Sequence, residues 1–197
     1  MDDLHTRYEG GNLVYWDTHR KRIVDAVGAD VVKFVEDFVQ SGLAAADAPL
    51  GWTVTLVETG GGESTITLPD AVGGALLLTT DAFENDGISM QLDGEAFELT
   101  SDQRLVYFGI RLQISDATQS DLLVGLCITD TALLGGMTDG VYFRKVDGST
   151  SLAAVTEKNS TETETTGVHT MVAATDVTPS NTSAVAFRSR EIATGDT

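Results

Sequence analysis

The residues best suited to acid–base chemistry in this 197-residue chain are its three histidines, His5, His19 and His169. A histidine base must lie within hydrogen-bond reach of a nucleophile, and none of the three stands in a motif that pairs it with serine or cysteine. The chain contains neither a G-x-S-x-G elbow nor an HExxH or paired CxxC zinc motif. We therefore interpret the histidines as structural or solvent-exposed residues, and we expect no catalytic residue, no cofactor and no bound metal.

Carboxylates offer a second route to acid–base chemistry, because two positioned acids can cleave a glycosidic bond. Glu95 and Glu98 are the best pair, since they flank a short expected strand. Among 30 Asp and Glu residues, however, chance pairs are common. Asp81, Glu84 and Asp86 are a candidate calcium loop, but their spacing differs from that of an EF-hand. We interpret this group as a solvated acidic turn.

Two further features have a structural interpretation. The run Gly60-Gly61-Gly62 lacks the Lys-Ser/Thr pair and the helix of a phosphate-binding loop, so we expect a hairpin loop between two strands. Cys127 is the single cysteine and cannot form an internal disulfide. It lies in an apolar run, which predicts a small buried hydrophobic residue.

Charge limits the partners that this chain is expected to bind. Thirty acidic residues against 12 basic ones give a net charge of −18, and residues 51–150 alone hold 15 acidic and four basic residues, a net of −11. Such a surface repels phosphates and anionic lipids, so we expect no nucleic-acid partner and no membrane partner. The one basic cluster is Arg20, Lys21 and Arg22, which is able to attract the acidic body of another copy.

Residues 1–48 are expected to form an N-terminal arm and a helical segment. Residues 1–16 are polar with scattered aromatic residues, and Gly10-Gly11 interrupts regular structure, which favours an extended arm. The one good helix pattern covers residues 17–40, where apolar residues recur at spacings of three and four. Gly28 in its middle leaves two shorter helices open. The stripe consists of Ile23, Val27, Val31, Phe34, Val35 and Phe38.

From Trp52 the pattern is that of short strands. Residues 52–57 and 64–68 predict a hairpin, and residues 104–115 alternate with five apolar residues on one face. Residues 122–129, 141–146, 151–156, 161–166 and 169–174 are further expected strands. About ten evenly spaced strands indicate a mainly β fold, an antiparallel jelly roll or β-sandwich over residues 49–176. Residues 177–197 are expected to be a polar C-terminal tail.

Several stretches together resemble a known group of proteins. They are residues 51–68, 108–131, 138–148 and 157–160, which include Trp52-Thr53-Val54-Thr55-Leu56-Val57-Glu58 and Asp139-Gly140-Val141-Tyr142-Phe143-Arg144-Lys145. Over roughly residues 15–175, the chain resembles capsid-associated structural proteins of tailed bacteriophages. The resemblance implies a jelly-roll or concanavalin-like sandwich that decorates or cements a capsid shell, with no catalytic residues to transfer.

The resemblance also implies partners and a location. A decoration protein contacts the major capsid protein and other copies of itself, as a dimer or trimer, on the outer surface of a virion assembled in the host cytoplasm. Interface centres are enriched in aromatic residues and arginine, which makes Tyr8, Tyr15, Trp16, Arg20, Lys21 and Arg22 the candidate interface. The alternative is a carbohydrate-binding, lectin-like module on a virion surface, for which the chain offers few aromatic residues outside the arm and strands.

Overall fold

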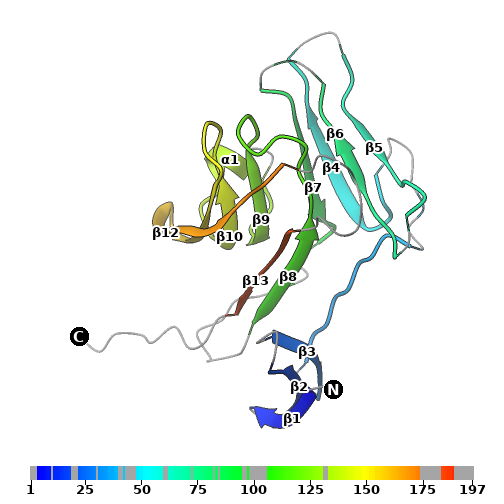
Figure 1. Ribbon diagram of the computed structural model, residues 1–197, viewed down its shortest axis with the longest axis vertical. Coiled ribbons are helices and arrows are strands. Elements are labelled where there is room, and N and C mark those ends of the chain that lie inside the picture. Colours follow the sequence, from blue (N-terminus) through cyan, green and yellow to red (C-terminus); the bar gives the residue numbers. More distant parts are fainter. Residues whose placement is uncertain are drawn as a thin grey trace. The chain divides into compact units, whose positions relative to one another are not determined.

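The computed structural model describes residues 4–9, 11–18, 22–29, 31–39, 42, 48–59, 62–71, 73–81, 83, 85–94, 97, 106–130, 133–173 and 183–188. Within these residues the fold is mainly β with antiparallel sheets, as the sequence predicted, and it contains one short helix, α1 (Leu133–Gly136) (Figure 1). The jelly-roll connectivity and the boundaries at residues 48 and 176 stay predictions.

The N-terminal residues form a three-stranded meander. Its strands, in the order β1-β2-β3, are β1 (Leu4–Glu9), β2 (Asn12–Asp17) and β3 (Arg22–Val27). For the described residues, the helix predicted over residues 17–40 is therefore wrong, and residues 4–9 and 12–16 belong to paired strands where an extended arm was expected. The apolar stripe is rich in β-branched residues such as Val27, which are stiff in helices and pack well in strands. Residues 31–37 have no regular secondary structure.

The largest sheet has four strands in the order β12-β11-β10-β9, so strands adjacent in the sequence pair in the sheet. They are β9 (Leu122–Cys127), β10 (Gly140–Lys145), β11 (Ser151–Lys158) and β12 (Thr161–Thr170). The strands expected at 122–129, 141–146 and 151–156 are confirmed. The strands expected at 161–166 and 169–174 are one continuous strand as far as Thr170, and it contains an irregularity at Gly167, where φ is +70°.

Two turns fix the register of this sheet. Asp147-Gly148 joins β10 to β11, with φ of +74° at Gly148 and a hydrogen bond of 2.9 Å from its N–H to the Thr118 carbonyl. Asn159 and Ser160 join β11 to β12 with φ of 51° and 60°. Two consecutive positive φ values in a two-residue loop define a type I′ hairpin turn. Lys158 and Thr161 consequently lie opposite each other.

One predicted pairing is wrong. β4 (Trp52–Val57) does not pair with residues 64–68 but with β7 (Gly87–Leu92), whereas β5 (Thr65–Thr67) pairs with β6 (Leu77–Thr79). Side chains tie β4 to its actual partner at both ends. The Thr53 hydroxyl donates to Asp93 at 2.6 Å, and the Thr59 N–H donates to Asp86 at 2.7 Å.

The strand predicted at residues 104–115 is confirmed as β8 (Tyr107–Leu112), and residues 104 and 105 lie outside the described residues. Its side chains alternate between exposed and half-buried, as the apolar alternation predicted. β8 pairs with β13 (Ser183–Arg188), which falls within the segment expected to be a polar tail.

The core of the four-stranded sheet lies on the face that α1 borders. Met137, Tyr142, Ala153 and Val155 are buried together, and Leu123 and the half-buried Cys127 pack against them. On β9, Gly125 lies opposite Tyr142, and a Cβ at this position would collide with the backbone of Val141 and Tyr142. Only glycine therefore allows the strands to approach this closely.

The opposite face of the same sheet buries a cation. Lys145 is 0% exposed, and its Nζ donates hydrogen bonds to the carbonyl oxygens of Ser120 and Val146. A buried ammonium group is costly unless it is hydrogen-bonded. These contacts hold the loop before β9 against the end of β10.

The chain divides into two compact units. Unit 1 contains residues 1–36, 99–107 and 187–197, and unit 2 contains residues 37–98 and 108–186. Among the described residues, no helix has the length and apolar character to cross a membrane.

Candidate interfaces

The meander of unit 1 presents a face with exposed apolar side chains, which is the first candidate interface. Residues directly opposite one another in neighbouring strands share a face of the sheet. Tyr8, Leu13 and Val27 form one such row, and Thr6, Tyr15 and the acidic Asp25 form the next. Tyr8 is 77% exposed and Val27 57% exposed. We call this face the N-terminal face; its apolar members are Leu4, Tyr8, Leu13, Tyr15 and Val27, and Asp17 and Asp25 lie on it as well.

The other face of the meander is the better-covered one. Val14 lies there with only 3% of its surface exposed. The Arg7 guanidinium carbon lies over the Trp16 ring, 4.9 Å from its centroid, in a cation–π contact. The meander therefore buries one side and leaves the N-terminal face at its surface.

The six predicted interface residues are thus not one surface. Tyr8 and Tyr15 share the N-terminal face, whereas Trp16 belongs to the opposite face. Arg22 begins β3, opposite Asp17. Arg20 and Lys21 lie outside the described residues. Their role, and that of Arg22, stays a prediction.

Exposed apolar residues continue beyond the meander into residues 31–39. Val32 and Val35 are 78% and 77% exposed, and Val39 is 57% exposed. Of these three residues, Val35 belongs to the apolar stripe that the sequence pattern assigned to one side of a helix. Without the helix, the segment leaves them on the surface.

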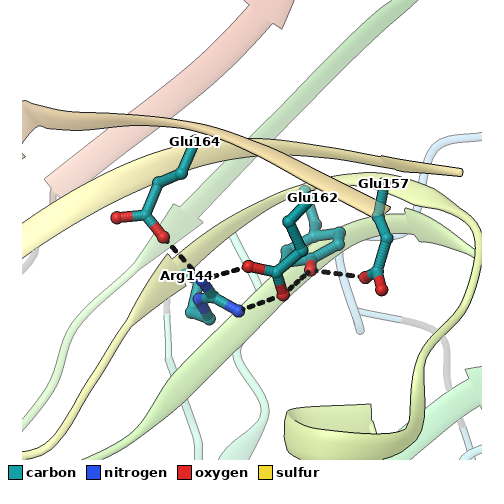
Figure 2. Close-up of polar contacts among 5 residues, drawn as sticks. Arg144, Glu157, Glu162 and Glu164 are labelled. Carbon is teal, nitrogen blue, oxygen red and sulfur yellow. Dashed lines mark hydrogen bonds and ion pairs between the residues drawn. The ribbon is translucent and has the colours of Figure 1, made fainter. Parts of the chain in front are cut away.

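A second candidate interface is a charged cluster on the four-stranded sheet, which no sequence motif indicated. Arg144 of β10 donates to both oxygens of Glu162, at 2.6 and 2.8 Å, and also to Glu164 (Figure 2). Glu162 and Glu164 are neighbours on the same face of β12 because they are two residues apart. Figure 2 shows the Arg144 guanidinium between the two carboxylates.

Tyr142 extends the cluster to a third carboxylate. Its hydroxyl donates to Glu157 at 2.9 Å and lies 3.4 Å from Glu162. Burial and the hydrogen bond to Glu157 raise the pKa of Tyr142, so the phenol keeps its proton. The hydrogen bond from Arg144 lowers the pKa of Glu162, which keeps this carboxylate ionised. The same bond to Glu162, with that to Glu164, raises the pKa of Arg144.

The surface beside the cluster has only a small hollow, lined by Leu134, Gly135, Met137, Tyr142, Glu157 and Glu162, with a volume of about 60 Å³. Small-molecule pockets have volumes of roughly 300–1,000 Å³. Both oxygens of Glu162 are also held by Arg144, which is a poor arrangement for a nucleophile. The geometry suits a contact surface better than an enclosed substrate site.

The other residues that the sequence singled out are scattered. His5 and His169 are exposed on β1 and β12, and His19 lies outside the described residues. Cys127 is half-buried, and burial raises the pKa of its thiol, which makes it a weak nucleophile. Glu84, Glu95 and Glu98 lie outside the described residues, so neither the pair Glu95/Glu98 nor the complete acidic turn is placed.

Part of the acidic turn is nevertheless visible. Asp86 accepts hydrogen bonds from the N–H and hydroxyl of Thr59, which lower the pKa of Asp86. Asp81 and Asp86 each bury one carboxylate oxygen without a hydrogen-bond partner. Among the residues that the structure describes, no group of three or more His, Cys, Asp or Glu side chains is arranged to hold a metal ion.

The charged cluster had one signal in the sequence. The alternation of Thr and Glu in residues 161–166 places every glutamate of the run on one face of a strand. The position of Arg144 opposite them depends on strand pairing, which the sequence pattern did not supply.

Comparisons with protein families, with curated proteins and with solved structures found no match to this chain.

Proposed function

We propose that this chain is a non-enzymatic capsid decoration protein, which binds the major capsid protein of a tailed bacteriophage from outside and stabilises the shell. The observation that carries the proposal is the N-terminal face, on which Tyr8 and Val27 are 77% and 57% exposed. Large apolar side chains gathered on one exposed face mark interaction sites. The sequence resemblance to phage capsid-associated proteins supplies the class of partner.

Two further features support a binding role over an enzymatic one. The charged cluster ties its ionised groups to one another, and the hollow beside it holds only about 60 Å³. The strongly negative chain, with a net charge of −18, also remains soluble at high copy number until a specific contact forms.

The test is co-sedimentation with empty shells assembled from the major capsid protein encoded in the same genome. We expect the wild-type chain to sediment with the shells and to saturate at a fixed ratio. The variant Val27→Asp places a charge in the N-terminal face, which would have to be desolvated on binding, and it is expected to weaken shell binding by about tenfold or more.

Val172→Asp is the matched control, because Val172 is 73% exposed and lies in unit 2. It should bind shells like the wild type. If the wild-type chain does not sediment, the decoration role is wrong, and a glycan array then tests the carbohydrate-binding alternative. Equal binding by both variants would remove the N-terminal face from the contact.

A further inference from the structure

Strand β12 is an unusually open edge. It forms one edge of the four-stranded sheet, and all ten of its residues are exposed. An edge strand presents unpaired N–H and C=O groups, which natural proteins usually cover or interrupt. Here only the part near Gly167 is interrupted, since the register shifts between Leu152 and Ala154 of β11. The part from Thr161 to Thr165 is regular.

The turn before β12 determines which of its peptide groups face outward. In a two-residue type I′ hairpin the flanking residues, Lys158 and Thr161, form a hydrogen-bonded pair. Hydrogen-bonded and non-hydrogen-bonded residues then alternate along an antiparallel strand. The peptide groups of Glu162 and Glu164 consequently point away from β11, toward any strand that would be added.

The side chains at these two positions carry an unbalanced charge. Glu157, Glu162 and Glu164 bring three carboxylates to the cluster, and among the described residues Arg144 is the one cation bonded to them. The formal net charge of the cluster is thus −2. The added strand would lay its own side chains directly beside Glu162 and Glu164, where two positive charges would bring the sum to zero.

This charge excludes one occupant. If β12 of a second copy paired with β12 in a register centred on residues 162–164, Glu162 or Glu164 would lie opposite a glutamate of the other copy. Like charges directly opposite in a sheet are destabilising. The edge therefore favours a strand with basic residues at alternate positions.

The chain itself contains such a segment. Arg20 and Arg22 are two residues apart, the spacing of Glu162 and Glu164, and residues two apart lie on one face of a strand. We propose that residues 20–22 of one copy add to the β12 edge of another copy, with the two arginines beside Glu162 and Glu164. Arg22 begins β3, itself an edge of the meander in the described sheet.

This inference deepens the proposed function by naming the contact between copies. The role of the contact in stabilising a shell rests on the proposed function, whereas the contact itself does not. The test is the mass of the full chain in solution by light scattering, which uses no shell. We expect a defined dimer or trimer for the wild type. Arg20→Glu/Arg22→Glu and, separately, Glu164→Lys should raise the dissociation constant by about tenfold or more, because each places like charges together.

Charge reversal on both sides provides the decisive variant. One of the two combinations, Arg20→Glu with Glu164→Lys or Arg22→Glu with Glu164→Lys, should restore the oligomer, and the successful one identifies the register. Glu162, which accepts two bonds from Arg144 in the wild type, is left unchanged in these variants, and circular dichroism checks that the sheet is retained. Lys158→Glu is the control, since it makes the same charge change as one arginine reversal and should leave the mass unchanged.

A monomeric wild type, or failure of both combinations to restore the oligomer, would overturn the proposed contact. Shell binding by a monomer would leave the decoration role standing without this contact. If the chain forms the oligomer but does not bind shells, the edge contact is supported and the decoration role is wrong.

Discussion

At the scale of single residues, Arg144 of β10 holds two glutamates of β12 that would otherwise repel each other. Its side chain is 18% exposed, and it forms ion pairs with two neighbouring glutamates that are 39% and 32% exposed. Bidentate arginine–carboxylate pairs have well-defined geometry and are stronger than neutral hydrogen bonds. Solvent screening at these half-exposed positions reduces their contribution to folding.

We expect Arg144→Met to lower the free energy of unfolding by about 1 kcal/mol at pH 7, after allowance for screening. The measurement is urea denaturation, with Lys158→Met as a control that removes an exposed cation from the same sheet. An unchanged midpoint for Arg144→Met would show that the cluster contributes nothing to stability.

The same substitution predicts a pH dependence. The folded pKa of Glu162 is below its unfolded value, so its contribution is complete above the unfolded pKa, which is about 4.3. The contribution is lost as the pH falls through the lower, folded pKa. The difference between wild type and Arg144→Met should therefore shrink in acid, and a constant difference down to a pH of about 2 would contradict it.

At the scale of elements, the hairpin β11–β12 shows what local sequence determines and what it does not. The turn contains Asn159 and Ser160, both at positive φ. Asparagine tolerates that conformation, whereas serine at φ of 60° carries a steric cost that glycine avoids. The turn therefore contains a correctable strain at one residue.

Ser160→Gly is expected to raise the free energy of unfolding by about 0.5–1 kcal/mol, because Asn-Gly is the preferred pair for a type I′ turn. In the wild type the N–H of Ser160 donates to the Thr138 carbonyl at 2.9 Å, and glycine keeps this backbone donor. Urea midpoints of Ser160→Gly and Ser160→Ala are to be compared. Alanine removes the same hydroxyl but keeps the Cβ, so an equal gain from both would contradict the steric explanation.

Sequence patterns predicted the strands better than their partners. Residues 122–129 and 141–146 were correct because apolar, β-branched runs bounded by Asp and Gly favour strands locally. The pairing of β4 with β7 was missed because Asp86 and Asp93, distant in sequence, bind Thr59 and Thr53. The helix prediction is wrong at residues 22–27, because the apolar residues that recur there at spacings of three to four are largely β-branched and favour a strand.

At the scale of the whole molecule, two properties stand out. The division into two units joins residues 1–36 with segments 99–107 and 187–197, and no local pattern signals such distant association. The charge of −18, in contrast, was available from composition alone. Like charges confined to a folded chain repel one another and destabilise the compact state.

We expect salt to stabilise this chain. Raising NaCl from about 20 to 500 mM shortens the screening length severalfold. A gain of about 1 kcal/mol would raise Tm by about 2–4 °C for a chain of this size. Thermal melts at pH 7 and pH 5 test this, with a smaller gain at pH 5, where fewer carboxylates are charged. A Tm that does not rise with salt at pH 7 would show that self-repulsion is unimportant.

The burial of Lys145 also affects covalent chemistry. Its amine is enclosed by protein and bound to two carbonyl oxygens, so acylating reagents and aldehyde fixatives have no path to it while the sheet is folded. Of the four lysines in the sequence, Lys145 is thus expected to remain unmodified when the native protein is cross-linked or surface-labelled. Modification at Lys145 would mark chains that had opened.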